Sequence, residues 1–356
     1  MRSFPVTQEN PPRSPFAKGE VFLRRLDMLF SLMMLRLTES DISSLGDVFK
    51  RSGLKPAHPM NHPGWLGAWA ETLLDGYELW LRIIESGGTA IGIAPLKVKG
   101  DDASLIGDAD VCDYLDFTVR PGAESDFFKA LVPGLRSSGI KKLELDSLRP
   151  DSAAVRYLVP YLNENTIVHN LTQTDVSLDM PLPKDWNTYL ASLTAHQRHE
   201  VGRKLRRLRE AAGEIVFSVE PPQDLNRSFS MLIDLLRRSR QDKAAFMTPE
   251  RERFFNRLAE EMNRAGYLRF GELAIGGRVL ASIMCFDYNN VRYLFNSGYE
   301  PNSAGLSVGL LSKALSIKDA IEQGLGRYDF LKGAEVYKYH LGGEEMPIYK
   351  LTVELS

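Results

Sequence analysis

Residues 267–309 read YLRFGELAIGGRVLASIMCFDYNNVRYLFNSGYEPNSAGLSVG, and this stretch decides the fold. The pairs Gly276-Gly277 and Asn289-Asn290 separate three apolar runs of similar length. Such pairs between apolar runs are typical of tight hairpin turns. The stretch therefore predicts three antiparallel strands in succession.

The third run leads into residues 303–309, SAGLSVG, where a long helical pattern begins. A turn of small residues at the start of a helix can hold an anion, because backbone N–H groups and the helix dipole point at it. The alternative is an ordinary helix start that Ser303 caps. A short strand at 328–331 follows, and residues 337–343 and 347–355 are expected to close the chain as a strand pair.

Similar patterns extend upstream in two blocks. Residues 178–356 predict two helices, a strand, two helices, three strands, a helix, a strand and a strand pair; residues 65–176 predict a related order of helices and strands. We expect an α/β (α+β) protein with mixed, mostly antiparallel sheets flanked by helices. The predicted modules span residues 41–177 and 178–356, after a poorly ordered extension at 1–40.

Bulk properties narrow the class of protein. The 356 residues carry a net charge of −2 and are 44% hydrophobic, so no overall field points to DNA. Cys112 and Cys285 lie far apart in apolar runs, which indicates a reducing, cytoplasmic protein without a disulfide or metal site. The apolar run 28–37 has ten residues, and a membrane helix needs about 20. We expect a helix packed on the body or a poorly ordered extension; a helix that touches a membrane surface is the alternative.

Two helical patterns carry distinctive side chains. Trp65, Trp69 and Leu73 recur every four residues, which is typical of a core-facing stripe. Residues 196–212 are rich in arginine, and Arg203 and Arg207 are candidates for binding an acidic acceptor, tRNA or a lipid head group. The alternative for this basic helix is a solvated face.

Several short motifs together resemble one protein family. They are LTAHQR at 193–198 with RKLRRL at 203–208, GGRVLAS at 276–282, YDFLKG at 328–333, YKYHLG at 337–342, HPGW at 62–65, IAPL at 93–96 and DYLD at 113–116. From about residue 60 onward the chain resembles the GNAT superfamily of acyl-CoA N-acyltransferases. Within it the chain is similar to the CelD-like acetyltransferases, which have tandem modules and are related to the Fem peptidyltransferases. The YKYHLG segment is the most specific of these motifs.

The resemblance implies that the second module binds acyl-CoA as co-substrate, without a metal, and that the first module shapes the acceptor cleft. The thioester would lie in a wedge between the third strand and the strand at 328–331, polarised near Asn296. The family's Arg/Gln-x-x-Gly-x-Gly/Ala turn is altered here, because Gly305 and Gly309 are four residues apart. The cofactor-binding candidates are Asn296, Ser303, Ala304, Gly305, Leu306, Ser307, Val308 and Gly309.

Acyl transfer to an amine requires a base for the amine and an acid for the leaving thiolate. Tyr337 and Tyr339 are the candidate acids, and only one of them can face the site if the segment is extended. Asp287 and Asp329 are the candidate bases. Lys338 is a candidate for binding an anionic acceptor or a phosphate, with a solvated lysine as the alternative.

The expected activity is transfer of an acetyl or acyl group to an amine, or a hydroxyl, of an envelope sugar, a polysaccharide precursor or a lipid, at the inner face of the membrane or in the cytoplasm. Fem-like aminoacyl transfer from tRNA is the second hypothesis, although the chain lacks a long heptad run for the helical arm that such enzymes often carry. A non-catalytic GNAT-like binding module is the third. The sequence does not indicate an oligomeric state.

Overall fold

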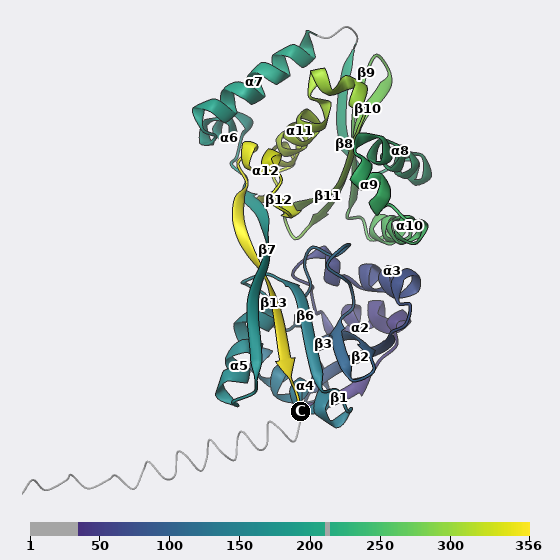
Figure 1. Ribbon diagram of the computed structural model, residues 1–356, viewed down its shortest axis with the longest axis vertical. Coiled ribbons are helices and arrows are strands. Elements are labelled where there is room, and N and C mark those ends of the chain that lie inside the picture. The colour runs from purple at the N-terminus through teal and green to yellow at the C-terminus, as the bar shows by residue number, and fades with distance from the viewer. Residues whose placement is uncertain (1–34, 211–213) are drawn as a thin grey trace, which may run out of the picture.

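The computed structural model describes residues 35–210 and 214–356 (Figure 1). The first part of the chain contains β1 (Leu35–Glu39), α2 (Leu45–Ser52), α3 (Pro63–Leu73), β2 (Glu78–Ser86), β3 (Thr89–Lys99), β4 (Asp102–Leu105), β5 (Thr118–Val119), α4 (Glu124–Ser137), β6 (Lys142–Leu148), α5 (Val159–Glu164) and β7 (His169–Pro181). The second part contains α6 (Trp186–Ser192), α7 (Ala195–Arg209), β8 (Ile215–Glu220), α8 (Leu225–Ser239), α9 (Gln241–Phe246), α10 (Pro249–Arg264), β9 (Leu268–Ile275), β10 (Arg278–Tyr288), β11 (Val291–Tyr299), α11 (Val308–Glu322), β12 (Arg327–Lys332), α12 (Val336–His340) and β13 (Glu344–Glu354).

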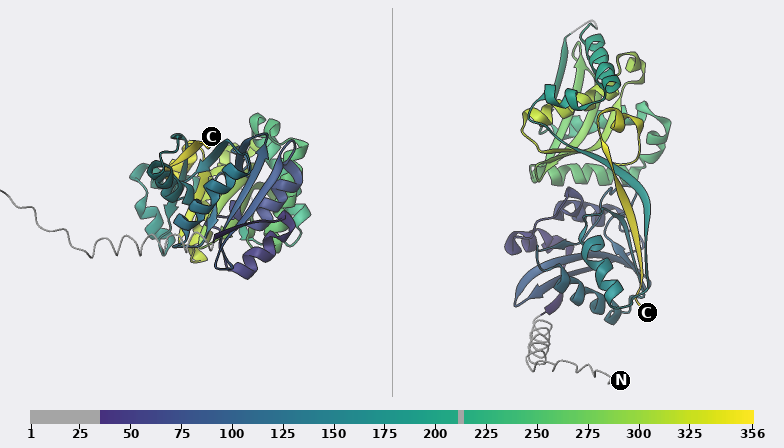
Figure 2. Two further views of the ribbon diagram at one scale, coloured as in Figure 1. Left: turned by 90° about the horizontal axis from the view of Figure 1, so that it is seen from below. Right: turned by 90° about the vertical axis from the view of Figure 1, so that its left-hand side faces the viewer.

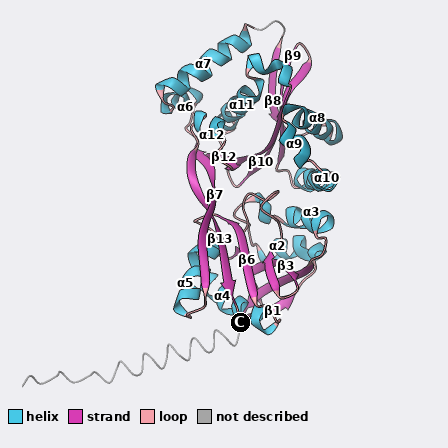
Figure 3. Cartoon of the chain, in the orientation of Figure 1, coloured by secondary structure: helices cyan, strands magenta, loops and turns pink. Residues whose placement is uncertain are grey.

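The fold is mixed α/β, with a mostly antiparallel sheet flanked by helices, as predicted (Figure 3). The strands of the described residues form one sheet in the order β1-β2-β3-β4-β6-β13-β7-β12-β11-β10-β9-β8, with β5 beside β3. Only two of its pairs, β4–β6 and β11–β12, are parallel. Each module therefore consists of an antiparallel run that ends in one parallel pair, which supports the predicted repeat.

The two hairpins predicted around residues 276 and 289 are confirmed. β9 pairs with β10 and β10 with β11, both antiparallel. Gly276, Gly277, Asn289 and Asn290 all have positive φ angles, as two-residue hairpin turns require. These turns form where expected because the signal is local in the sequence.

The last strands of the two modules are exchanged. β7, at the end of the first module, pairs with β12 of the second, whereas β13 at the end of the chain pairs with β6 of the first. β7 and β13 also pair with each other along most of their length and run between the modules (Figure 2). The chain therefore crosses the predicted boundary at 177/178 inside a strand, and its final residues complete the sheet of the first module.

Helices cover both faces of the sheet in the second module (Figure 1). α8 and α10 pack on one face and contribute to a core that also contains α3 of the first module, and α11 packs on the opposite face. The predicted tryptophan stripe is buried in that shared core: the ring centroids of Trp65 lie 5.1 Å from Phe295 and 5.4 Å from Phe286. Aromatic pairs at such distances stabilise the contact beyond area burial alone, so the modules share packing.

Two predictions about local structure are corrected. The segment 337–343 was expected to be extended, but Val336–His340 forms the short helix α12. Within the extension predicted at 1–40, Leu35–Glu39 forms the edge strand β1 and pairs with β2. The rest of that extension, residues 1–34, lies outside the described residues.

Candidate functional site

Strands β11 and β12 part in the middle of the second module. Only Val291–Tyr293 of β11 pair in parallel with Arg327–Asp329 of β12. Beyond these residues β12 remains paired with β7 alone. Phe295 of β11 has no partner on β10, because Leu294 pairs with Cys285 and Asn296 pairs with the adjacent Met284. β11 therefore bulges at Phe295. A bulge bends a strand away from its neighbour. The split lies where the sequence predicts a wedge beside Asn296.

A cavity of about 350 Å³ follows β11 beyond the split, and we call it the cationic cavity. Its wall contains Ser297 and Tyr299 of β11. Its basic side chains are Lys204, Arg240, Lys243 and Lys313, and its acidic side chain is Glu335. Four basic groups against one acidic group make this cavity suited to an anionic ligand.

The predicted anion-binding turn forms part of this wall. A 3-10 turn, Pro301–Leu306, leads to Ser307 in a left-handed conformation, and α11 begins at the next residue. Ser307 caps α11 without a side-chain hydrogen bond, and in the described residues the N–H groups of Val308 and Gly309 donate to no backbone acceptor. Ser303 does not cap α11, contrary to the alternative prediction.

Half of the predicted cofactor-binding residues line the cationic cavity. They are Ala304, Ser307, Val308 and Gly309; the structure places Asn296, Ser303, Gly305 and Leu306 outside its lining. Gly309 is required by packing, because a Cβ atom there would lie 2.8 Å from the ring of Tyr299.

Two lysines of the cavity were not singled out as site residues from the sequence. Lys313 of α11 is 6% exposed, and its Nζ donates to the carbonyl of Gly309 at 2.8 Å. Lys243 of α9 donates to the carbonyl of Ser297 at 2.7 Å. Burial, with the second lysine nearby, lowers the pKa of Lys313 to about 7. Burial and the charge of Arg240 lower the pKa of Lys243 to about 8. A lysine inside the apolar pattern of the 308–322 helix was the signal that could have revealed Lys313.

Of the candidate acids, the structure places Tyr337 in the cavity and Tyr339 outside it. The Tyr337 ring lies 4.9 Å from Nζ of Lys313, and burial raises the pKa of its hydroxyl. The Tyr339 hydroxyl instead bonds the Glu345 carboxylate on the surface. Only Tyr337 is placed to reach a ligand here.

Lys338 has a structural environment that the sequence did not predict. It is 2% exposed, and its Nζ donates to the carbonyls of Leu331, Lys332 and Gly333 at 3.0, 2.6 and 3.0 Å. Glu335 lies 2.8 Å from the same ammonium group. Both predictions for Lys338, substrate binding and a solvated side chain, are therefore wrong: it fastens α12 to the end of β12.

Only some of the basic side chains of helix α7 lie at the cationic cavity. Lys204 lines the cavity, and a Cβ atom on Gly305 would lie 3.9 Å from Nη2 of Arg207. Arg203, by contrast, is about half exposed and pairs with Glu200 at 2.9 Å. Arg207 therefore lies beside the anion-binding turn, and Arg203 belongs to the solvated face.

A second cavity, of about 310 Å³, lies where β11 and β12 are last paired, and we call it the acidic cavity. Tyr293 and Asp329, the last register pair, both line it. The first module supplies most of the remaining wall. Its acidic lining residues are Asp116, Asp151, Asp179 and Asp329, and its basic ones are Arg149 and Arg327.

Like Asp116, whose pKa burial also raises to about 7, Asp329 is a perturbed carboxylate of the acidic cavity. It is 2% exposed, accepts from the Tyr114 hydroxyl at 2.8 Å and lies 3.6 Å from Arg149. Burial raises its pKa to about 7, against the opposing charge of Arg149. Tyr328 and Phe330 pack with the α11 core, so Asp329 between them faces the first module. The structure thus places this candidate base at the split.

His58 also lines the acidic cavity. It is 6% exposed, and its Nδ1 has no hydrogen-bond partner among the described residues. Burial and the Arg149 charge lower its pKa to about 3. At neutral pH it is an uncharged imidazole.

The other candidate base, Asp287, lies in an ion-pair network away from both cavities. Arg292, which is 1% exposed, donates to both of its oxygens at 2.7 and 2.8 Å, and Arg269 lies 3.4 Å away. Both carboxylate oxygens of Asp287 are therefore already occupied by hydrogen bonds from Arg292. Asp287 is therefore a structural residue, and its prediction as a base is not supported.

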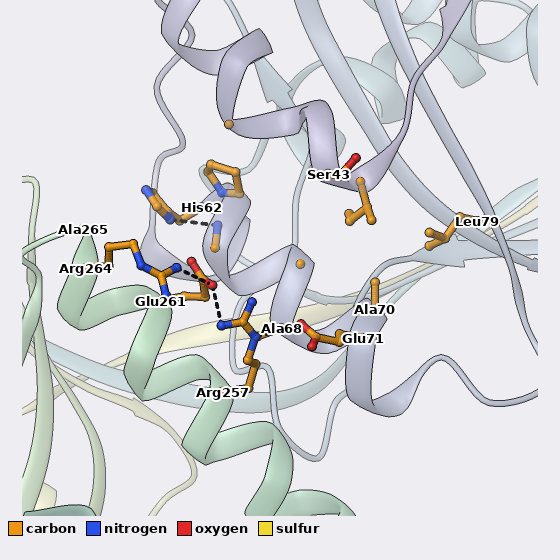
Figure 4. A pocket seen from close by; sticks show the side chains of 15 residues that line it. Ser43, His62, Ala68, Ala70, Glu71, Leu79, Arg257, Glu261, Arg264 and Ala265 are labelled. Atoms are coloured by element: carbon orange, nitrogen blue, oxygen red, sulfur yellow. Dashed lines mark hydrogen bonds and ion pairs between the residues drawn. The ribbon is translucent and has the colours of Figure 1, made fainter. Parts of the chain in front are cut away.

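A third cavity, of about 650 Å³, lies between α3 and α10 and is shown in Figure 4. Its polar groups are already engaged: Glu261 pairs with Arg257 and Arg264, each at 2.7 Å. His62 accepts from the N–H of Gly64, and burial lowers its pKa to about 4. This cavity offers small apolar side chains and no free reactive group in the described residues, so we do not place the chemistry there.

Residues 195–339 match the family model described as an acetyltransferase (GNAT) domain. This match covers the turn, the cationic cavity and the split strands. The chain has a GNAT superfamily fold related to that of Fem. No curated protein matches the sequence significantly.

Solved structures agree with the GNAT fold along nearly the whole chain. FemX superimposes with a TM-score of 0.58 at 12% identity, covering 88% of this chain and 96% of that chain. A conserved protein of unknown function from Bacteroides thetaiotaomicron VPI-5482 gives 0.60 at 10%, covering 90% and 100%. The C-terminal domain of a putative lysylphosphatidylglycerol synthetase from Agrobacterium fabrum gives 0.56 at 10%, covering 88% and 92%. At such identities the likeness concerns the fold.

No helix at 35–210 or 214–356 is long and apolar enough to cross a membrane. In the same ranges, no group of three or more His, Cys, Asp or Glu side chains is arranged to hold a metal ion.

Proposed function

We propose that this protein transfers an acyl group from acyl-CoA to an amine, with the donor in the cationic cavity and the acceptor in the acidic cavity. One observation carries this: two cavities of opposite charge lie on either side of the point where β11 and β12 part. An anionic carrier is attracted to the first and an ammonium acceptor to the second. The GNAT fold supports acyl transfer as the reaction class.

The residues at the split supply the proton transfers. Asp329 takes a proton from the acceptor ammonium, and the free amine nitrogen attacks the thioester carbon. The C–S bond breaks, and the thiolate takes a proton from the Tyr337 hydroxyl. As the amide forms, the nitrogen gives its second proton to the resulting Tyr337 phenolate. A base with a pKa of about 7 is well matched to this task at neutral pH.

We propose an amine-bearing envelope precursor or lipid as the acceptor, with a hydroxyl as the alternative nucleophile. The acidic cavity supports the amine, because its carboxylates outnumber its guanidinium groups four to two. The fold shared with FemX and the synthetase domain supports an envelope or lipid acceptor only by analogy. We place the reaction in the cytoplasm or at the inner face of the membrane.

Aminoacyl-tRNA is the alternative donor, as the resemblance to the Fem peptidyltransferases implies. The observation that favours it is the basic face of α7 beside the anion-binding turn, with Lys204 in the cavity and Arg207 next to Gly305. A nucleic-acid donor would use this face for its phosphates, and its binding would weaken steeply with salt.

One assay separates these functions. The purified protein is incubated with acetyl-CoA and a panel of amines, and release of free CoA thiol is measured. Acceptor-dependent thiol release that Asp329→Asn abolishes is the expected result. Transfer only from aminoacyl-tRNA would replace the first proposal with the second. No turnover with either donor would leave a non-catalytic binding module.

A further inference from the structure

Within the proposed donor site, we infer that Lys313 and Lys243 form an anion-binding subsite that holds a phosphate or carboxylate group of the acyl donor. The inference rests on the proposed function for the identity of the ligand, but not for the existence of the subsite. Both ammonium groups line one cavity, and each already bonds one backbone carbonyl of the wall, Gly309 for Lys313 and Ser297 for Lys243.

Neither lysine has a carboxylate within 4.0 Å among the described residues, unlike the other cations of the cavity. Lys204 pairs with Glu200 at 3.3 Å, and Arg240 pairs with Asp242 at 2.6 Å. Burying a positive charge without a partner costs free energy, and proteins normally pair such charges. An anionic ligand between the two lysines supplies the missing partner.

The Lys313 side chain runs back along α11 to its first turn. There the N–H groups of Val308 and Gly309 donate to no backbone acceptor in the described chain. Backbone donors, the helix dipole and an ammonium group therefore point to the same end of the cavity. This arrangement provides charge where the sequence lacks the family's Gly-x-Gly turn.

The surroundings of the lysines predict that anion binding takes up protons. Lys313 is faced by Lys243, Glu335, Lys338, the Cys285 thiol and the Tyr337 ring, and Lys243 by Arg240, Asp242 and Glu335. Both pKa values are lowered in the empty cavity, so the amines are largely neutral above about pH 8. A bound anion favours their charged forms and raises both pKa values.

Titration calorimetry of the full-length protein tests this in wild type. CoA, inorganic pyrophosphate and succinate are titrated at about pH 8 in two buffers of different ionisation enthalpy. The expected result is uptake of about one proton per bound anion, falling toward zero near pH 6, where both lysines are already charged. Binding of pyrophosphate but not succinate assigns the subsite to a donor phosphate; the reverse assigns it to a carboxylate on the acyl group.

Substitutions then identify the groups responsible. Lys313→Met and Lys243→Met are each expected to weaken binding of the effective anion by about 10- to 100-fold, because each removes a charged hydrogen bond. Lys318→Met is the matched control: it lies on the same helix, is 42% exposed and pairs with Glu322, and should bind normally. Lys313→Met should keep or raise the melting temperature, because it loses a buried charge that has no carboxylate partner among the described residues.

The outcomes separate this inference from the proposed function. CoA binding that neither variant weakens, without proton uptake in wild type, overturns the subsite and leaves acyl transfer intact. Failure of all three anions to bind at millimolar concentration also overturns it. Lysine-dependent anion binding without turnover supports the subsite and contradicts the proposed function.

Discussion

Asp329 is the proposed base, and its burial also lowers the stability of the folded protein as pH rises. One substitution, Asp329→Asn, tests both effects. Its folded-state pKa of about 7 lies above the ordinary value of 3.8, so the folded protein binds an extra proton between these values. That contribution to stability is therefore lost as pH rises from about 4 through 7. Asp329→Asn should therefore show no such loss of stability over this pH range. It should lower kcat/KM about 100-fold or more.

Urea unfolding at several pH values and the thiol-release assay measure both effects. Asp287→Asn is the control, since that carboxylate pairs with buried Arg292. It should lose about 3 kcal/mol of stability and leave kcat unchanged. An Asp329→Asn protein with full turnover would remove Asp329 from the mechanism. In wild type, kcat/KM should rise with pH, with an inflection near 7.

Tyr337 and Tyr339 lie two residues apart but should behave differently. Tyr337→Phe keeps the ring beside Lys313 and removes only the hydroxyl that we assign to the leaving thiolate. We expect kcat to fall about tenfold or more, with little change in KM for the donor. Tyr339→Phe removes a surface bond to Glu345 and should leave both constants unchanged. Steady-state kinetics with unaltered kcat in Tyr337→Phe would exclude the acid role.

At the scale of elements, one lysine of α12 fastens this helix to the end of β12. Lys338 satisfies three carbonyl groups at the end of β12, and Met in its place leaves them buried without donors. Lys338→Met should lose about 3 kcal/mol and speed hydrogen exchange over residues 331–343. The control Lys332→Met alters a partly exposed neighbour. Unchanged stability and exchange in Lys338→Met would show that α12 forms independently of this contact.

These elements also show what the sequence could predict. The hairpins at Gly276 and Asn289 were predictable because two adjacent residues specify each turn. The helical form of 336–340 was not, because its contacts include a lysine bonded to another element, which the local sequence does not reveal. Packing between elements likewise pairs Asp287 with Arg292 and buries Lys313. Local sequence patterns do not reveal such contacts. The start of the long helix within residues 303–309 was located from the sequence, but the lysines that line the cavity beside it were not.

At the scale of the whole molecule, the exchange of β7 and β13 ties the modules together. The module boundary was predicted from the order of elements, and that order contains no information on which sheet the last strand joins. The structure places β13 beside β6, and a shared aromatic core packs α3 against the second module. The two modules should therefore unfold together.

The buried strand β13 provides the test. Leu351 is fully buried in the core between the first module's strands, and Leu351→Ala removes about 3 kcal/mol of packing. Because β13 belongs by sequence to the second module and by pairing to the first, the loss should lower one common transition in calorimetry. Tryptophan fluorescence, dominated by Trp65, Trp69 and Trp80 of the first module, should report the same midpoint as the donor-site tyrosines. Two transitions, of which only one shifts, would mean that the modules fold separately, and the split between β11 and β12 would then not depend on the first module for its shape.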